Sequence, residues 1–291
     1  MGLSYTNIKR KRKHSRPTKR QRLTKLLVGL IATAISLAAV YTIVKSSWTS
    51  DSDPSKTQTP DVTISGLTDP DNFIAAYVLA NCGDNQLEEI QSIRISGRLA
   101  VDDASNSFTM FKKRPDLMRL NFKQGVLEIT ITANGDTVWS GVQAPQQVEQ
   151  FALIEGDKAK QWLHMGHFLN QIVEHYINNK DLPAIQIADR QGKEYLQVSF
   201  QNNDGSSESL LVDPLTMHVD AGIRIAADGI VSETTFSDYR NVQGMMIPFQ
   251  MVTSINDEIV SRTQIKQASI NTGVPSWLFK LPESLNQATM N

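Results

Sequence analysis

The chain has 291 residues, enough for one or two domains, with 29 Lys and Arg against 30 Asp and Glu. Its single cysteine, Cys82, excludes an internal disulfide framework. The net charge of −1 hides an asymmetry, because residues 46–291 carry 18 Lys and Arg against 30 acids, a net charge of −12. So acidic a body is a poor partner for nucleic-acid phosphates, and we expect no nucleic-acid binding.

The first 44 residues predict a membrane anchor. Residues 8–25 hold ten Lys and Arg, and residues 26–44 follow with nineteen residues and no charge. As a helix the second stretch would span about 28 Å, close to the ~30 Å hydrocarbon core of a bilayer. It is longer than the apolar core of a cleaved signal peptide, and no small-residue cleavage site follows it. Nuclear targeting of the basic run is the alternative.

The charges also predict an orientation. Because basic residues beside a spanning helix stay in the cytoplasm, residues 1–25 form a basic cytoplasmic tail and residues 45–291 lie outside. A disulfide-free outer part fits a bacterial periplasm. We therefore expect a single-pass protein of the inner (cytoplasmic) membrane. Its Ser-, Thr-, Asp- and Pro-rich linker, residues 45–69, would lead to a periplasmic domain at residues 70–291.

This domain begins with a predicted helix, residues 69–83, which Asp69 or Asp71 can cap and Gly83 can end. We expect Cys82, near its end, to be a small, half-buried thiol. The apolar period then changes to two. Strands are predicted at 90–101, 107–114, 117–123, 126–133 and 136–142, with a tight turn at 133–136. Residues 146–179 predict helices.

A second strand series closes the chain, with six or seven strands between residues 184 and 271. This order predicts an α+β fold, in which about eleven antiparallel strands form one sheet and the helices gather on one side. So large a sheet tends to curl. We expect a curved antiparallel half-barrel with the helices as a lid over an apolar mouth.

No catalytic or cofactor motif is present: the sequence has no G-x-S-x-G, no H-E-x-x-H, no phosphate-binding glycine loop and no paired-cysteine site. We expect no enzyme and no cofactor. His164, His167 and His175 fall within about 80° of arc on an ideal helix, so they could bind a metal or sense pH. The simpler interpretation, which we prefer, is a solvated helix face opposite an apolar face that includes Phe168, Leu169 and Ile172. That apolar face either covers a pocket or fills a core.

Four stretches resemble a known family. "KKRPDLMRL" (112–120), "NGDTVW" (134–139) and "FKLPE" (279–283) occur in the order and approximate spacing of the LolA-like periplasmic carriers of outer-membrane lipoproteins. "TTFSDYRNVQGMMIPFQM" (234–251) is similar to a segment of outer-membrane lipoprotein-sorting proteins. The resemblance covers about residues 71–283. It implies a half-barrel that holds the acyl chains of lipoproteins or lipids, without a cofactor.

The resemblance also implies roles for three residues. Arg114 corresponds to an arginine that hydrogen-bonds to the lid, and Met118 to a cavity residue that is usually aromatic. Trp139 corresponds to the tryptophan of the "NGDTVW" strand, whose role is either structural or in the cavity. For Arg114 the alternative is an exposed edge-strand arginine beside Lys112 and Lys113.

The carriers are soluble shuttles, whereas this chain is predicted to be anchored. A tethered protein could extract cargo at the inner membrane, pass it to envelope transport proteins, or sense it. We therefore expect a membrane-anchored lipid- or lipoprotein-binding protein. The alternative is a sensor or scaffold ectodomain of an envelope protein complex.

Overall fold

The computed structural model describes residues 64–82, 89–101, 104–166, 168, 171–177, 182–202 and 205–288. The basic tail, the predicted anchor at 26–44 and nearly all of the predicted linker lie outside this range. Within it, no helix is both long enough and apolar enough to cross a membrane.

The described residues form an α+β domain, as the sequence predicts, built on one thirteen-stranded antiparallel sheet. The strands are β1 (Ser92–Val101), β2 (Ala104–Lys113), β3 (Leu117–Gln124), β4 (Leu127–Asn134), β5 (Thr137–Gln143), β6 (Gln150–Ile154), β7 (Ile185–Arg190), β8 (Lys193–Gln201), β9 (Ser207–Val212), β10 (Val219–Ile225), β11 (Val231–Val242), β12 (Met245–Ile255) and β13 (Glu258–Ile270). The helices are η1 (Ile64–Thr68), α2 (Pro70–Cys82), α3 (Gly156–Gly166), α4 (Gln171–Ile177), η3 (Ser276–Phe279) and α5 (Glu283–Ala288).

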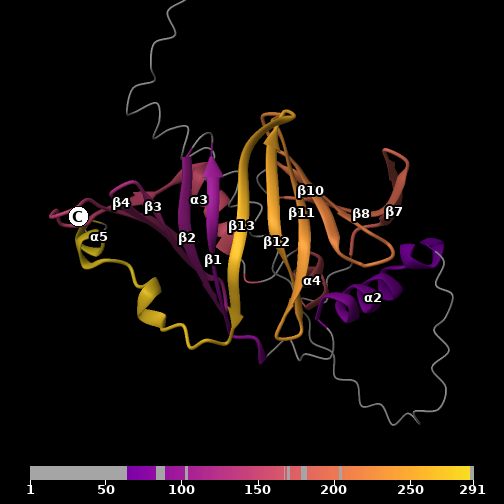
Figure 1. Ribbon diagram of the computed structural model, residues 1–291, viewed down its shortest axis with the longest axis horizontal. Helices are drawn as coiled ribbons and strands as arrows, with labels where there is room; N and C mark the ends of the chain where they lie inside the picture. Colours follow the sequence, from indigo (N-terminus) through magenta and orange to yellow (C-terminus); the bar gives the residue numbers. More distant parts are fainter. Residues whose placement is uncertain are drawn as a thin grey trace, which may run out of the picture.

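The strand order explains how the helices come to cover the sheet. From edge to edge it is β6-β5-β4-β3-β2-β1-β13-β12-β11-β10-β9-β8-β7, so the first and last strands pair in the middle (Figure 1). The chain runs outward from β1 to the edge strand β6, and next enters the sheet at the opposite edge, β7. The segment between them, which holds α3 and α4, must therefore cross one face. The sheet is open, with β6 and β7 at its edges.

The predicted number of about eleven strands is too low, and the predicted helical region begins too early. β6 lies within residues 146–179, which we predicted as helical. It has five residues, pairs with β5 alone among the described strands, and shows no clear apolar alternation. Its structure depends on this pairing, which local sequence does not reveal. The turn at 133–136 is confirmed by the pairing of Asn134 with Thr137 and by Gly135 at φ 62°.

Helix α2 begins as its sequence predicts. Asp69 Oδ1 accepts hydrogen bonds from the backbone N–H groups of Asp71 (3.1 Å) and Asn72 (3.0 Å), so Asp69 is the N-cap and Pro70 the first helical residue. Cys82 ends the described helix and is fully buried, more than we predicted. Burial raises the pKa of its thiol, which makes it a poor nucleophile.

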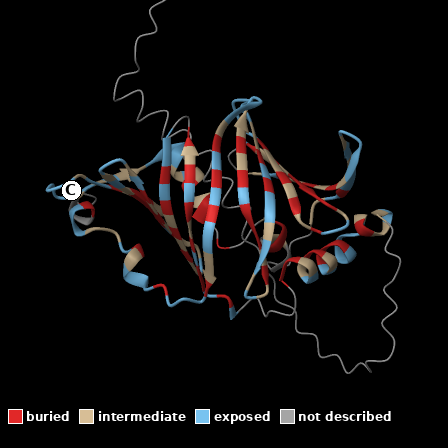
Figure 2. Cartoon of the chain, in the orientation of Figure 1, coloured by how far each residue is buried: buried red, intermediate tan, exposed pale blue. Residues whose placement is uncertain are grey.

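The two faces of the sheet differ. Buried and more exposed residues alternate along the central strands (Figure 2). The buried set defines an inner face, against which the side chains of α2, α3 and α4 pack in one core. Its strand residues include Ile95, Met110, Leu120, Ile131, Val198 and Ile265. The other set, which includes Arg94, Arg98 and Arg262, defines the outer face.

The pairing of β1 with β13 is irregular at the centre of the sheet. Its register passes from Ser96↔Gln267 to Gly97↔Ile265, which leaves Lys266 as an extra residue. A Cβ atom on Gly97 would overlap the carbonyl oxygen of Gln264, so only glycine fits this approach. A second register shift lies between β12 and β13. Bulges of this kind bend a strand and increase its twist, which curves the sheet around its helices.

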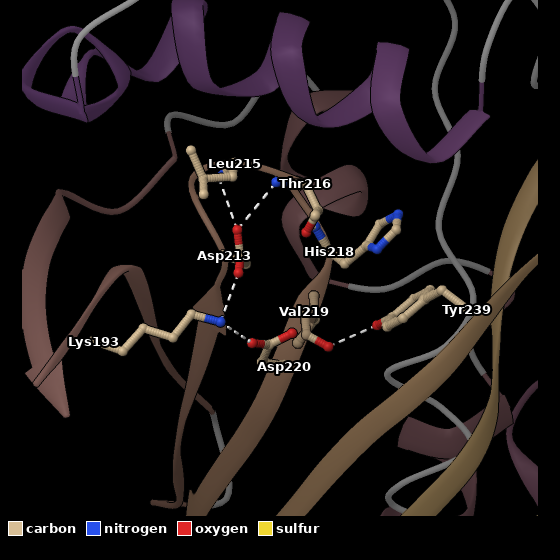
Figure 3. A network of polar contacts seen from close by, with 8 residues as sticks. All are labelled: Lys193, Asp213, Leu215, Thr216, His218, Val219, Asp220 and Tyr239. Carbon is tan, nitrogen blue, oxygen red and sulfur yellow. Dashed lines mark hydrogen bonds and ion pairs between the residues drawn. The ribbon is translucent and has the colours of Figure 1, made fainter. Parts of the chain in front are cut away.

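A polar network fixes the connection between β9 and β10 beside α2 (Figure 3). Asp213 Oδ1 accepts hydrogen bonds from the N–H groups of Leu215 (2.8 Å) and Thr216 (3.0 Å). Lys193 Nζ lies 2.6 Å from Asp213 Oδ2 and 2.7 Å from Asp220 Oδ2. Side-chain hydrogen bonds to Asp213 and then Asp220 raise the pKa of Lys193. The network holds the turn in one conformation.

The same connection attaches α2 to the sheet. Asn81 Nδ2 donates to the carbonyl oxygen of Met217 at 2.8 Å. The His218 ring stacks on Tyr239, with 4.2 Å between ring centroids, and the Tyr239 hydroxyl donates to Val219 O at 2.6 Å (Figure 3). Burial lowers the pKa of His218, against the attraction of nearby Asp220 and Asp213. These contacts are structural and lie beyond the candidate site.

Candidate ligand-binding face and its helical cover

Three of the predicted cavity residues meet on the inner face. Met118 (1% exposed) lies on β3, and Phe168 (2%) and Ile172 (0%) come from the helical segment above it, all within one core. We call α3, α4 and Phe168 between them the helical cover. The predicted residue Leu169 lies outside the described residues. The amphipathic pattern of this segment therefore does face the sheet.

Trp139 does not join this group. It pairs with Thr132 on β4, whereas its neighbour Val138 pairs with Ala133, and only Val138 and Ala133 belong to the inner-face core. Trp139 is buried (1%), so it packs on the outer face. Sequence could not decide between the two faces, because Val138 and Trp139 are both apolar.

The C-terminal segment covers this part of the outer face. Lys113 Nζ donates to Val274 O (2.9 Å), Arg119 Nη1 to Leu278 O (3.0 Å) and Asn134 Nδ2 to Phe279 O (2.9 Å). Three neighbouring strands, β2, β3 and β4, thus hold residues 274–279 by their backbone. Phe279, the first residue of the "FKLPE" motif, belongs to this strap on the outer face.

Arg114 lies between the start of the sheet and the helical cover. Its Nε donates to Ile90 O at 2.8 Å, and its guanidinium carbon lies 4.8 Å from the centroid of the Phe168 ring. A cation over an aromatic face at this distance is attractive. The Phe168 ring is therefore a contact of Arg114 with the cover, and the hydrogen bond to Ile90 O goes to a residue before β1. A latch function for Arg114 stays a prediction.

The alternative for Arg114, an exposed edge-strand arginine, is wrong. Arg114 directly follows β2, which is paired on both sides by β1 and β3. Its neighbour Lys112 is 1% exposed and lies on the inner face opposite Ile93 and Met118. Phe108, Met110 and Lys112 alternate along β2, and this spacing indicates that Lys112 shares the buried face. The apolar Phe111 on the other face obscured the pattern.

Polar contacts from both halves of the sheet hold the cover. From the β2–β3 connection, Asp116 Oδ1 accepts the backbone N–H of Phe168 at 2.9 Å. From the other half, Asn202 Oδ1 accepts a hydrogen bond from Gln171 Nε2 at 2.8 Å. Glu208 on β9 places Oε2 3.3 Å from His164 Nε2. The cover thus bridges two halves that pair with each other only at the centre of the sheet.

The prediction of a solvated histidine face is wrong for the two histidines that the structure describes. The His164 side chain is 24% exposed and faces Glu208. The His175 ring contacts Phe200 of β8 edge-on, with 5.2 Å between centroids. His167 lies outside the described residues. Among the described His, Cys, Asp and Glu residues, no group of three or more is arranged to hold a metal ion.

The buried side chains of the cover are mainly apolar. The buried side chains there are Trp162, Met165, Phe168, Ile172 and Val173. Trp162 is 1% exposed, and within the described structure its indole Nε1 has no hydrogen-bond partner. Buried Trp N–H groups usually find an acceptor. Trp162 Nε1 is therefore an unused donor on the underside of the cover, a feature that sequence alone could not reveal.

No protein-family model and no curated protein matches this sequence. Solved structures resemble it at low identity. A LolA superfamily protein from Nitrosomonas europaea is 12% identical with a TM-score of 0.47, over 71% of this chain and 97% of that one. A DUF1329 family protein from Desulfovibrio piger is 12% identical with a TM-score of 0.49, over 73% and 98%. A chain of the MucA/MucB complex from Pseudomonas aeruginosa is 8% identical with a TM-score of 0.26, over 74% and 61%. Since these TM-scores are below 0.5, the likeness does not indicate what this chain binds.

Proposed function

We propose that this protein binds the acyl chains of a lipid or lipoprotein between the inner face of its sheet and the helical cover. The observation that supports this function is the mainly apolar underside of a short, two-helix cover, packed on a mainly apolar sheet face. An acyl chain that displaced the cover would replace one set of apolar contacts by another. The proposal includes no chemical step, and we expect no enzymatic turnover.

The magnitudes allow such an exchange. Five buried apolar side chains of the cover, at about 1.5–3 kcal/mol each, are worth roughly 8–15 kcal/mol. An acyl chain of about sixteen carbons gains roughly 13 kcal/mol, at ~0.8 kcal/mol per buried CH₂. Because the two values are similar, the chain could bind and still be released. The unpartnered Trp162 Nε1 would suit the ester or amide carbonyl of such a ligand.

The proposal also includes the location. The uncharged stretch at 26–44 would anchor the chain in the inner membrane, with the basic tail in the cytoplasm and the domain in the periplasm. Partners would be the acyl chains themselves, the inner membrane, and envelope transport proteins that deliver or accept cargo. A reporter fused after Asn291 should be active only on the periplasmic side. Activity in the cytoplasm would contradict this orientation.

A disulfide between cover and sheet would test whether the cover must move. A Cβ on Gly166, at the end of α3, would lie 3.4 Å from the Cβ of Ala133 on β4. Disulfides join Cβ atoms about 3.5–4.5 Å apart. We expect the full-length Gly166→Cys/Ala133→Cys variant, purified in a non-ionic detergent, to bind a fluorescent fatty-acyl probe when reduced and to lose this binding when oxidised. Buried Cys82 should not interfere.

The two single-cysteine variants are the controls, and both should bind the probe whether oxidised or reduced. If the oxidised and the reduced double variant bound the acyl probe with equal affinity, an entry route under the cover would be rejected. Failure of the wild-type chain to bind any acyl probe would reject the function itself. If the wild-type chain bound no acyl probe by itself but crosslinked to one stable partner protein in membranes, the sensor or scaffold alternative would replace the lipid-binding function.

A further inference from the structure

A shallow depression lies on the outer face at the centre of the sheet, where β2, β1, β13 and β12 run side by side (Figure 1). Its volume is about 380 Å³. It is lined by Arg98, Ala100, Ser105, Gln250, Met251, Val252, Arg262, Thr263 and Gln264. No acidic residue is among them. The depression therefore collects hydrogen-bond donors on a domain whose overall charge is strongly negative.

The strand register brings two arginines together there. Arg98 on β1 pairs with Gln264 on β13, and the next residue of the same face, Ala100, pairs with Arg262. Arg98 and Arg262 are thus diagonal neighbours on adjacent strands, a relation that lets long side chains meet. Gln250 on β12 pairs with Gln264 and extends the row of polar groups.

Neither arginine has a partner within the described part of the protein. Both side chains are exposed, and no described carboxylate lies within ion-pair distance of either. Two other arginines of the domain do have carboxylate partners: half-buried Arg190 pairs with Glu233, and exposed Arg240 pairs with Asp238. Two unpaired guanidinium groups side by side repel each other unless an anion neutralises them.

We propose that this depression is a binding site for a phosphate group, carried either by a phospholipid head group or by free phosphate. Each guanidinium presents a planar fork of N–H donors that matches phosphate oxygens two at a time. Ser105 and the carboxamides of Gln250 and Gln264 supply neutral donors around them. A phosphate can accept bonds from this spread of directions, whereas a carboxylate has only two coplanar oxygens.

This site is independent of the acyl-binding function, because it lies on the opposite face from the helical cover. The two faces can therefore be tested separately. A ligand with a phosphate and no acyl chain has no reason to enter the apolar inner face. Suitable probes are inorganic phosphate and glycerophosphoglycerol, the deacylated head group of phosphatidylglycerol. Acyl-probe binding to the same sample then reports on the inner face.

The experiment titrates each probe into the full-length chain in a non-ionic detergent at constant ionic strength, and measures the heat of binding. We expect Arg98→Gln/Arg262→Gln to weaken binding by about tenfold or more, because charge-assisted bonds to both forks are lost. The matched control is Arg240→Gln/Lys280→Gln, which removes the same charge at exposed positions outside both the depression and the helical cover. The control should bind phosphate like the wild type, and all variants should keep their affinity for the acyl probe.

The outcomes are distinct. Tighter binding of glycerophosphoglycerol would assign the site to a lipid head group, and tighter binding of inorganic phosphate to a free phosphate, and both support the proposal. No binding of either probe would overturn it. An equal loss in the control variant would also overturn it, because net charge alone would then explain the affinity. Binding of a polyglutamate peptide without binding of phosphate would replace it by an acidic-peptide site.

Discussion

Arg114 is the residue through which the sheet and the helical cover can be tested most directly. Its contacts with Ile90 O and the Phe168 ring are both lost in Arg114→Leu. Together they are worth roughly 1–3 kcal/mol, which corresponds to about tenfold or more in the opening of the cover. We expect the amides of α3 and α4 to exchange with solvent correspondingly faster, as measured by hydrogen exchange of the full-length chain.

A double-mutant cycle identifies the contact. If Arg114 acts on the cover through the Phe168 ring, Arg114→Leu and Phe168→Leu should together accelerate exchange by less than the product of their separate effects. Because the two residues are in contact, the shortfall measures their interaction. Purely multiplicative effects would show that the cation over the ring contributes nothing. Exchange in Arg114→Leu at the wild-type rate would leave Arg114 without a role in holding the cover.

Single residues also show what sequence can and cannot predict. Apolar spacing predicted that Phe168 and Ile172 share a buried face, and both lie in the core with Met118, which the family resemblance had suggested. It failed for Trp139 and Lys112, since a period of two separates the faces of a strand without saying which face is covered. Trp139 is buried on the outer face, the face on which the strap of residues 274–279 binds β2, β3 and β4. Only long-range structure, absent from local pattern, could show that.

At the scale of elements, the β9–β10 connection supports α2 through Asp213. In Asp213→Ala the N–H groups of Leu215 and Thr216 lose their acceptor and Lys193 loses one of its two carboxylates. We expect the free energy of unfolding to fall by about 1–3 kcal/mol. Asp220→Ala removes only the more exposed carboxylate, and should cost less than about 1 kcal/mol. Urea denaturation of both variants checks this, and equal losses would contradict the network shown in Figure 3.

Asp213 also makes a prediction about pH. Burial alone would raise the pKa of Asp213, but hydrogen bonds from Lys193 and from the amides of Thr216 and Leu215 outweigh it, so the pKa is lowered in the folded state. The stabilisation is therefore complete above about 3.9, the usual value for Asp, and is lost as pH falls through the lowered value. The difference in unfolding free energy between wild type and Asp213→Ala should stay constant from about pH 7 to 5 and shrink below about pH 4. A difference unchanged at pH 3 would contradict the assignment.

Elements with strong local signals were predictable, and those that depend on neighbours were not. The N-cap of α2 and the turn at 133–136 follow from residue types that suit these positions. β6 does not, because five residues with weak alternation become a strand only beside β5. The histidines of the cover were misplaced for a related reason. His164 and His175 lie on the side of the helices that faces β8 and β9. A helix that contacts the sheet on two sides has no single solvent-exposed face opposite its apolar face.

At the scale of the whole molecule, one pairing determines the topology. β1 and β13 are far apart in sequence and meet at the centre of the sheet, which leaves β6 and β7 at opposite edges. The chain between those edges must cross a face, so the cover is a consequence of this pairing. Sequence predicted helices on one side of a curved sheet, but not this pairing, since nothing local distinguishes the first and last strands from their neighbours.

The pairing of β1 with β13 can be tested with a matched pair of glycines. A Cβ on Gly97 would overlap Gln264 O and lie 3.0 Å from Ile265 Cα, both backbone atoms of β13. A Cβ on Gly222 in β10 would meet only side chains, Leu210 at 3.5 Å and Phe236 at 3.7 Å, which is ordinary contact. Both glycines lie within strands and lack the positive φ that would by itself disfavour alanine. The backbone of β13 at the centre of the sheet cannot move away from an added Cβ, whereas the ends of the Leu210 and Phe236 side chains can.

We therefore expect Gly97→Ala to lower the free energy of unfolding by about 1–3 kcal/mol or more, the usual cost of overpacking. Gly222→Ala should be neutral or slightly stabilising, because alanine suits a strand better than glycine does where space allows. Urea denaturation of the two full-length variants measures both values. Since β1–β13 is the pairing that joins the two halves of the sheet, hydrogen exchange in Gly97→Ala should also rise on both sides of it and in the cover that bridges them. Equal destabilisation by the two substitutions would show that the close approach at Gly97 is not what joins the halves.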